Sequence, residues 1–88
     1  MRIEILTPDT NIFTGEVSLV QLPGLDGLFE ILDNHAPMIA ALTQGKAKVV
    51  CNGETKFFDI TGGVVEVLKN KIIVLARSEE HTSELQSR

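Results

Sequence analysis

The sequence has 88 residues, the length of one small domain, and a formal net charge of −4. No run of Lys or Arg is present, so the basic face that nucleic-acid binding needs is excluded. A single cysteine, Cys51, excludes an internal disulfide and fits a reducing compartment. The chain lacks the apolar core of a signal peptide and any apolar stretch long enough to span a bilayer, so we expect a soluble protein.

The apolar composition predicts an aliphatic core. Hydrophobic residues make up 43% of the chain, whereas the only aromatic residues are four Phe. This content is sufficient for one packed core. We therefore expect that core to consist mostly of Ile, Leu and Val.

Apolar and polar side chains alternate with a period of two through most of the chain. In chain order, the alternation is clearest at residues 2–5, 16–22, 46–49, 56–57, 65–67 and 71–72. This period places one side chain inward and the next toward solvent, as in a half-buried antiparallel sheet. The sequence therefore predicts an all-β protein, a flattened antiparallel β-sandwich of about 8–10 short strands.

Turn-forming residues separate the alternating runs. A Pro-Asp-Thr-Asn cluster at residues 8–11 is typical of a turn. Asn52-Gly53 predicts a tight hairpin, because both residues tolerate positive φ, and residues 69–71 predict a second one. Residues 36–42 leave two alternatives open, a strand or a single helical turn.

The end of the chain differs in character from the rest. After Ala76 the alternation stops, and residues 77–87 contain one apolar side chain, Leu85. This stretch resembles the in-frame translation of a short-read sequencing adapter. We therefore expect a domain of residues 1–76 and a non-native tail of residues 77–88, disordered or weakly helical, outside the fold.

The sequence contains no recognisable catalytic or metal-binding constellation. Its two histidines are His35 and His81, of which the second lies in the tail, and together with Cys51 they are too few for a metal site. Cys51 precedes a turn and is interpreted as an inert strand-end residue. No phosphate-binding Gly-Lys-Ser/Thr motif is present. We expect no enzyme activity, no cofactor and no metal.

Two glycine-containing segments have structural interpretations. Residues 24–27 are either a surface turn or an exposed contact loop, since Leu25, Leu28 and Phe29 are too apolar for a plain solvated turn. Both interpretations stay open. Gly62-Gly63 indicates a bulge or a close approach of two backbones rather than a ligand site.

Five groups of short motifs occur in a consistent order along the chain. They are Ile-Leu-Thr-Pro at 5–8 with 12–17, Leu-Pro-Gly at 22–24 with Asp-Gly at 26–27, Asn-His-Ala-Pro at 34–37, Phe-Asp-Ile at 58–60 with 62–67, and Val-Leu-Ala at 74–76. Together they resemble the amino-terminal β-sandwich domain of the epsilon subunit of F-type ATP synthase. Taken alone, Asp33-Asn34 is interpreted as a turn and His35 as a satisfied histidine at the rim, with Pro37 holding Ala36 extended.

The resemblance implies a non-catalytic subunit of the central stalk (rotor), which links the gamma subunit to the membrane c-ring and couples proton flow to ATP synthesis. It implies a c-ring-facing loop made of Gly24, Leu25, Asp26, Gly27, Leu28, Phe29 and Glu30. It implies a gamma-facing surface that contains Thr7, His35, Ala36, Pro37 and Ala40. It also implies a peripheral position on the cytoplasmic face of the bacterial inner membrane, with membrane association only through the complex.

This sequence departs from longer family members in one respect, and the departure limits which functions the resemblance implies. Longer members continue into two helices that can inhibit the motor and, in some, bind ATP. That segment is absent from this sequence, so neither inhibition nor nucleotide binding is assigned to it.

Two other functions are alternatives to the role of a central-stalk subunit. A prosthetic-group carrier module would use Lys69 or Lys71 at a hairpin tip, although the Met-Lys or Asp-Lys context of such modules is missing. A hydrolytic enzyme would need a nucleophile and a base, and the sequence offers no such pair.

Overall fold

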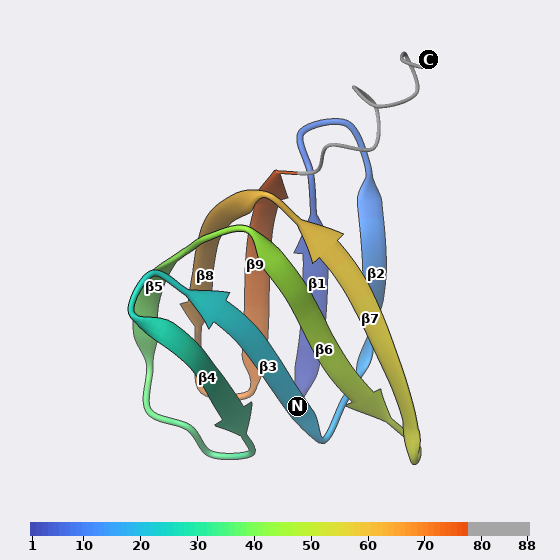
Figure 1. Ribbon diagram of the computed structural model, residues 1–88. Coiled ribbons are helices and arrows are strands. Elements are labelled where there is room, and N and C mark those ends of the chain that lie inside the picture. The colour runs from blue at the N-terminus through green and yellow to red at the C-terminus, as the bar shows by residue number, and fades with distance from the viewer. Residues whose placement is uncertain (78–88) are drawn as a thin grey trace.

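The structure is a computed structural model, and it describes residues 1–77. These residues form nine β-strands and no helix (Figure 1). The strands are β1 (Arg2–Leu6), β2 (Asn11–Glu16), β3 (Leu19–Gly24), β4 (Gly27–Leu32), β5 (Met38–Leu42), β6 (Gly45–Cys51), β7 (Glu54–Ile60), β8 (Gly62–Val67) and β9 (Lys71–Arg77). The all-β prediction is confirmed, and the ambiguous segment at residues 36–42 contributes strand β5.

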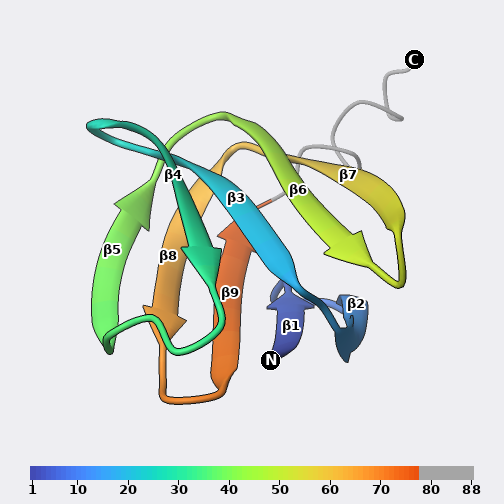
Figure 2. The same ribbon diagram turned by 90° about the horizontal axis from the view of Figure 1, so that it is seen from below.

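The strands follow one curled path in the order β2-β1-β9-β8-β5-β3-β6-β7, with β4 paired to β3. The step from β5 to β3 consists of one residue pair, Gly24 with Leu42. The path bends sharply there, so β3, β4, β6 and β7 lie over the layer that contains β1, β8 and β9 (Figures 1 and 2). This arrangement is the predicted sandwich.

One strand pairing differs from the expected antiparallel pattern. β9 lies between β1 and β8, antiparallel to β8 and parallel to β1. A period-two pattern reports which face of a strand is buried, but it does not report the direction of the neighbouring strand. The sheet is therefore mixed.

The space between the two layers holds an aliphatic core. Its side chains are almost completely buried, and among the described residues no polar or charged residue is buried with them. The core residues are Ile3, Ile5, Val17, Val20, Leu22, Ile31, Leu42, Ala47, Val49, Ile60, Val65, Val67, Ile72, Val74 and Ala76. Burying each of the larger aliphatic side chains stabilises the fold by roughly 1.5–3 kcal/mol. The predicted aliphatic core is confirmed.

The turns also follow the sequence. Asn52 and Gly53 have φ values of 53° and 81° and connect β6 to β7, as a two-residue hairpin requires. The second hairpin joins β8 to β9, where the Leu68 amide donates to the Lys71 carbonyl at 2.7 Å. Gly63 has φ 138°, and a Cβ atom there would overlap the backbone carbonyl of Leu75. The predicted close backbone approach is therefore present.

The last strand extends one residue past the expected boundary. β9 includes Arg77, and its carbonyl accepts a hydrogen bond from the Thr61 amide at 2.8 Å. Backbone pairing depends little on side-chain identity, which explains how Arg77, the first residue of the segment predicted to be non-native, can continue the strand. The rest of that segment, with His81, lies outside the described residues. Residues 1–77 contain no helix of the length and apolar character needed to cross a membrane.

Candidate functional site

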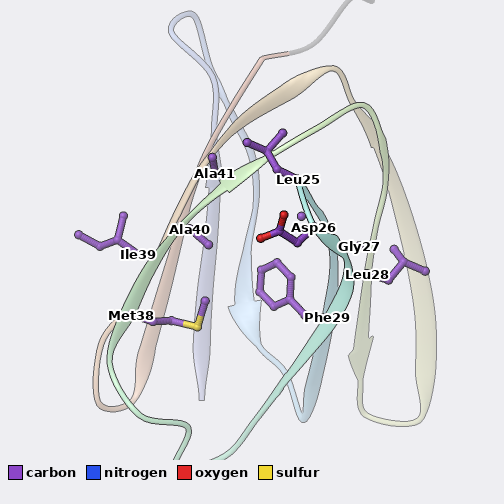
Figure 3. Close-up of a pocket in the computed structure, with 10 residues that line it drawn as sticks. Leu25, Asp26, Gly27, Leu28, Phe29, Met38, Ile39, Ala40 and Ala41 are labelled. Carbon is purple, nitrogen blue, oxygen red and sulfur yellow. The ribbon is translucent and has the colours of Figure 1, made fainter.

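A groove of about 520 Å³ opens between the β3–β4 turn and strand β5 (Figure 3). β4 pairs with β3 and β5 pairs with β8, while no strand pairing joins β4 to β5. The groove occupies this unpaired margin of the sandwich. Its lining residues are Gly24, Leu25, Asp26, Gly27, Leu28, Phe29, Met38, Ile39, Ala40 and Ala41.

The tip of the groove is a two-residue turn, Leu25-Asp26, closed by the pair Gly24 and Gly27. Gly27 has φ 125°, a conformation that side-chain-bearing residues rarely adopt. Leu25 and Leu28 are 67% and 65% exposed. The segment is therefore both a surface turn and an exposed apolar loop, and its contact role stays a prediction.

Backbone hydrogen bonds fix this tip against the end of β5. The Leu25 amide donates to the Ala41 carbonyl at 3.2 Å, and the Thr43 amide donates to the Pro23 carbonyl at 2.8 Å. A Cβ atom at Gly24 would overlap the Phe29 ring, so the glycine lets the ring lie close to the turn. One end of the groove is thus held in place by bonds that do not depend on a partner.

The charge around the groove is acidic. Asp26 is the only charged residue that lines it. Glu30, further along β4, accepts a hydrogen bond from the Gln21 side-chain amide at 3.3 Å. Residues 3–45 contain no Lys or Arg. This surface therefore favours a partner that presents apolar side chains with basic residues at their edge.

The predicted gamma-facing residues fall in three places. Ala40 lines the groove together with six of the seven predicted ring-facing residues. His35, Ala36 and Pro37 form the connection from β4 to β5, where His35 Nδ1 lies 2.7 Å from the Ala36 carbonyl oxygen. The two predicted surfaces therefore meet at Ala40.

Thr7 lies at the other end of the sandwich from the β4–β5 connection. The strand registers align Leu6 with Leu75, Val64 and Ala41, so Thr7, which follows Leu6, lies near the end of β5. His35 precedes the start of the same strand, roughly 17 Å away along the strand direction. The Thr7 hydroxyl donates to the Thr10 carbonyl at 3.1 Å, which stabilises the β1–β2 turn.

Sequence reasoning missed a second apolar surface, on the outer face of β5, β8 and β9. Ile39, Val64 and Leu75 are 71%, 41% and 55% exposed there. Val64 pairs with Leu75 across the two strands. Consecutive apolar residues, as at 72–76, indicate a strand that is apolar on both faces, and that signal could have revealed this surface.

The described residues offer little for covalent or metal chemistry. Residues 1–77 contain no group of three or more potential metal ligands. Cys51 ends β6 in a half-buried position. Lys69 lies exposed in the β8–β9 turn, whereas Lys71 belongs to β9 and its Nζ lies 3.5 Å from Glu4 Oε2. The features that stand out are apolar surfaces suited to contact with other proteins.

Comparison with protein families and curated sequences gives consistent findings. The family described as ATP synthase, Delta/Epsilon chain, beta-sandwich domain matches residues 1–82. The chain is 39% identical over 84 residues to the ATP synthase epsilon chain of Pelotomaculum thermopropionicum, covering 96% of this chain and 63% of that protein. It is 45% identical over 75 residues to the ATP synthase epsilon chain of Chlorobium limicola, covering 84% of this chain and 85% of that protein.

Two solved structures share the fold. A chain of the Tetrahymena thermophila mitochondrial ATP synthase central stalk and c-ring structure superposes with a TM-score of 0.74 at 15% identity, covering 99% of this chain and 72% of that one. A chain of the Euglena gracilis mitochondrial ATP synthase structure gives 0.79 at 19% identity, covering 84% and 48%. At these identities the likeness concerns the fold alone.

Proposed function

Because the chain belongs to the family of ATP synthase delta/epsilon chain β-sandwich domains, we propose that it acts as an epsilon chain in the central stalk, linking the gamma subunit to the membrane c-ring. In this role it catalyses no reaction. It couples proton flow to ATP synthesis by passing rotation from the ring to the axle. The chain spans 63% of the Pelotomaculum protein, so the proposal concerns the β-sandwich and not the remainder of longer relatives.

The observation that carries the proposal is an exposed apolar margin on a tightly packed domain. Leu25 projects from a turn that backbone hydrogen bonds hold against β5, and Leu28 projects from the adjoining start of β4. Exposed apolar groups of this kind mark interaction sites. A core of aliphatic side chains packed at crystal-like density deforms little, so it transmits force between the surfaces on either side.

We place the ring-facing contact at residues 24–30, where the turn tip is apolar and carries Asp26. We place the gamma-facing contact at His35, Ala36, Pro37 and Ala40, with Thr7 as a separate contact at the far end. The acidic groups around the groove would set orientation and association rate more than affinity. Through this complex the chain would lie at the cytoplasmic face of the bacterial inner membrane.

The carrier alternative has less support. It requires a lysine at a hairpin tip, and only Lys69 meets that condition, because Lys71 lies within β9 beside Glu4. Intact-mass measurement after expression with a biotin or lipoate ligase tests it. A mass increase that disappears in Lys69→Arg would favour the carrier over the stalk.

Binding to a purified gamma subunit tests the proposed function. The gamma subunit of Pelotomaculum thermopropionicum is a suitable partner, since that organism's epsilon chain is 39% identical to this one. We expect a stable one-to-one complex in size-exclusion chromatography. Absence of a complex with the gamma subunits of both Pelotomaculum and Chlorobium would overturn the proposal.

A further inference from the structure

We propose that Asn52 is a site of spontaneous covalent modification, at which the side-chain amide loses ammonia after attack by the Gly53 backbone nitrogen. Asn52 and Gly53 form the exposed two-residue turn between β6 and β7. The reaction needs no catalytic side chain, because both reacting groups belong to the turn itself. The inference is independent of the proposed function, since it uses neither the groove nor any partner.

The reaction is an intramolecular acyl transfer followed by hydrolysis. The deprotonated Gly53 nitrogen attacks the side-chain carbonyl carbon of Asn52 and forms a new C–N bond, while the side-chain nitrogen leaves as ammonia together with the proton. The product is a cyclic imide. Water then opens the imide at one of its two carbonyl groups, which gives either aspartate or isoaspartate at position 52. No electrons are gained or lost, and water is the only co-reactant.

The glycine that follows Asn52 favours this ring closure. Gly53 has no side chain to obstruct the approach of its nitrogen to the side-chain carbonyl carbon of Asn52. Its φ is 81°, and nothing lies within 4 Å of the position that a Cβ atom would take. Both residues are exposed, so water reaches the imide once it has formed.

The hairpin leaves the attacking nitrogen free. Its ladder closes with the pair Cys51 and Glu54, so the Gly53 amide lies within the turn and takes no part in strand pairing. Within residues 1–77 this amide donates to no backbone or side-chain acceptor. An amide held in a hydrogen bond must first lose that bond before its nitrogen attacks, so the free amide of Gly53 lowers the barrier.

The sequence contains one other site for the same imide chemistry, Asp26-Gly27, and its turn is built differently. Gly27 closes the ladder opposite Gly24, whereas Gly53 lies between the closing residues. Because Leu28 faces Pro23, which has no amide hydrogen, the alternation of the ladder makes Gly24 and Gly27 a hydrogen-bonded pair. The Gly27 amide is therefore engaged, and we expect folding to suppress imide formation at Asp26.

The remaining three asparagines are less reactive for other reasons. Asn34 also has a positive φ of 68°, but the amide that follows it, that of His35, donates to the Leu32 carbonyl at 3.2 Å. Asn34, Asn11 and Asn70 all precede residues that carry a side chain, which obstructs ring closure. Asn52 is therefore the asparagine at which sequence and fold both favour the reaction.

The modification would alter the end of the β6–β7 hairpin. Either product replaces a neutral amide by a carboxylate close to Glu54, and so adds one negative charge to a chain whose formal net charge is −4. Isoaspartate also carries the main chain through its side-chain carbon, so the turn gains a backbone atom and no longer matches the two-residue geometry. The turn and β5 lie on opposite sides of the molecule, so the groove would be spared (Figures 1 and 2).

Incubation of the folded chain at mildly alkaline pH, followed by peptide mapping with mass spectrometry, tests the inference. We expect ammonia loss at Asn52 to be about tenfold or more faster than at Asn11, Asn34 or Asn70, because its barrier is lower. A synthetic peptide of residues 48–57 shows the rate without the fold. An equal rate at Asn34 would overturn the inference. So would an unmodified Asn52 in the folded chain after the peptide has reacted.

Two comparisons isolate the contribution of the fold. Imide formation at Asp26 should be about tenfold slower in the folded chain than in urea, whereas ammonia loss at Asn52 should differ by less than about threefold. Equal slowing at both sites would show that the hairpin does not leave the Gly53 nitrogen free, and would overturn the inference. Asn52→Gln is the matched control, since glutamine keeps the amide but must close a larger ring. Persistence of the charge change in that variant would contradict the assignment to Asn52.

Discussion

The two margins of the sandwich, where the layers approach each other, are built differently. At one margin, Phe13 of β2 packs against Phe58 of β7 with ring centroids 5.4 Å apart, and Lys56 Nζ lies 5.8 Å from the Phe13 ring centroid. At the other, β4 and β5 leave the apolar groove. The first margin uses its aromatic side chains for contacts within the domain. The second leaves apolar side chains such as Leu25 and Leu28 exposed, and this difference agrees with the binding role that we propose for it.

The largest expected effect comes from disturbing the pairing of β8 with β9, in the sheet from which both margins extend. Gly63→Ala would place a Cβ atom against the Leu75 carbonyl in a backbone with φ 138°. We expect the free energy of unfolding to fall by roughly 3 kcal/mol or more, measured by urea denaturation. Gly27→Ala is the matched control, since Gly27 has φ 125° and nothing lies within 4 Å of its Cβ position. That control should cost roughly 1 kcal/mol, and an equal cost at both positions would show that backbone strain alone, without the clash, explains the effect.

The closed margin is tested by Phe58→Ala. Phe58 is half-buried, packs against the core and makes the aromatic pair with Phe13. We expect a loss of roughly 2 kcal/mol in the free energy of unfolding. Its neighbour Phe57 is 58% exposed, so Phe57→Ala should change stability by less than about 0.5 kcal/mol. Equal losses for the two variants would mean that the closed margin does not stabilise the domain.

The open margin should give the opposite result. Leu28 is 65% exposed, so Leu28→Ala should leave the free energy of unfolding within about 0.5 kcal/mol of the original value. Binding to the c-ring should weaken about fivefold to tenfold, because Leu28 belongs to the proposed ring-facing contact and its apolar contact there is lost. Calorimetric titration measures this effect, with Phe57→Ala as the surface control. Unchanged binding would remove Leu28 from the interface.

The smallest expected effect concerns an ion pair at the end of the open margin, which ties the amino terminus to Asp33 and is called the tether below. The Met1 α-amino group lies 3.1 Å from Asp33 Oδ1, just beyond β4, and 3.6 Å from Glu16 Oε1. Its hydrogen bond to Asp33 raises the pKa of this amino group above its ordinary value of 8.0. A raised pKa in the folded state stabilises the fold below about pH 8, and that contribution is lost as the pH rises through the folded pKa.

Unfolding measurements at about pH 7 and about pH 10 check this tether. Asp33→Asn should abolish most of the pH-dependent difference that the amino group contributes. Other groups titrate over the same range, but they do so equally in both chains. An identical pH dependence for the original chain and Asp33→Asn would show that the tether contributes nothing to stability.

Much of this architecture could be predicted from the sequence, because local chemistry determines it. Alternating side chains defined the strands, and Asn52-Gly53 could occupy the positive φ values of a two-residue hairpin. Residues 38–42 could not be assigned, since five apolar residues fit a helical turn as well as a strand. In the structure these residues pair with β8, so they form a strand.

The parts that sequence could not supply depend on contacts between distant segments. Ala40 lies beside the Gly24–Phe29 loop because the path of strands bends between β5 and β3, and no local signal records that bend. The groove exists because β4 and β5 are left unpaired with each other, a property of the strand order. The apolar outer face at Val64 and Leu75 is different, since consecutive apolar residues such as 72–76 signal a strand that is apolar on both faces, although they do not tell which face is covered.

The position of β9 has a consequence for how the chain acquires its structure. The final strand is the one that fills the middle of its layer, with β1 on one side and β8 on the other. During synthesis, β1 cannot pair with β9 until about seventy further residues have left the ribosome. Closing so long a loop is entropically unfavourable, and domains dominated by such distant pairings fold in roughly milliseconds to seconds. The layer that contains β1 and β8 is therefore complete only once β9 is available, and any product that stops short of β9 leaves these two strands without their shared partner and open to aggregation.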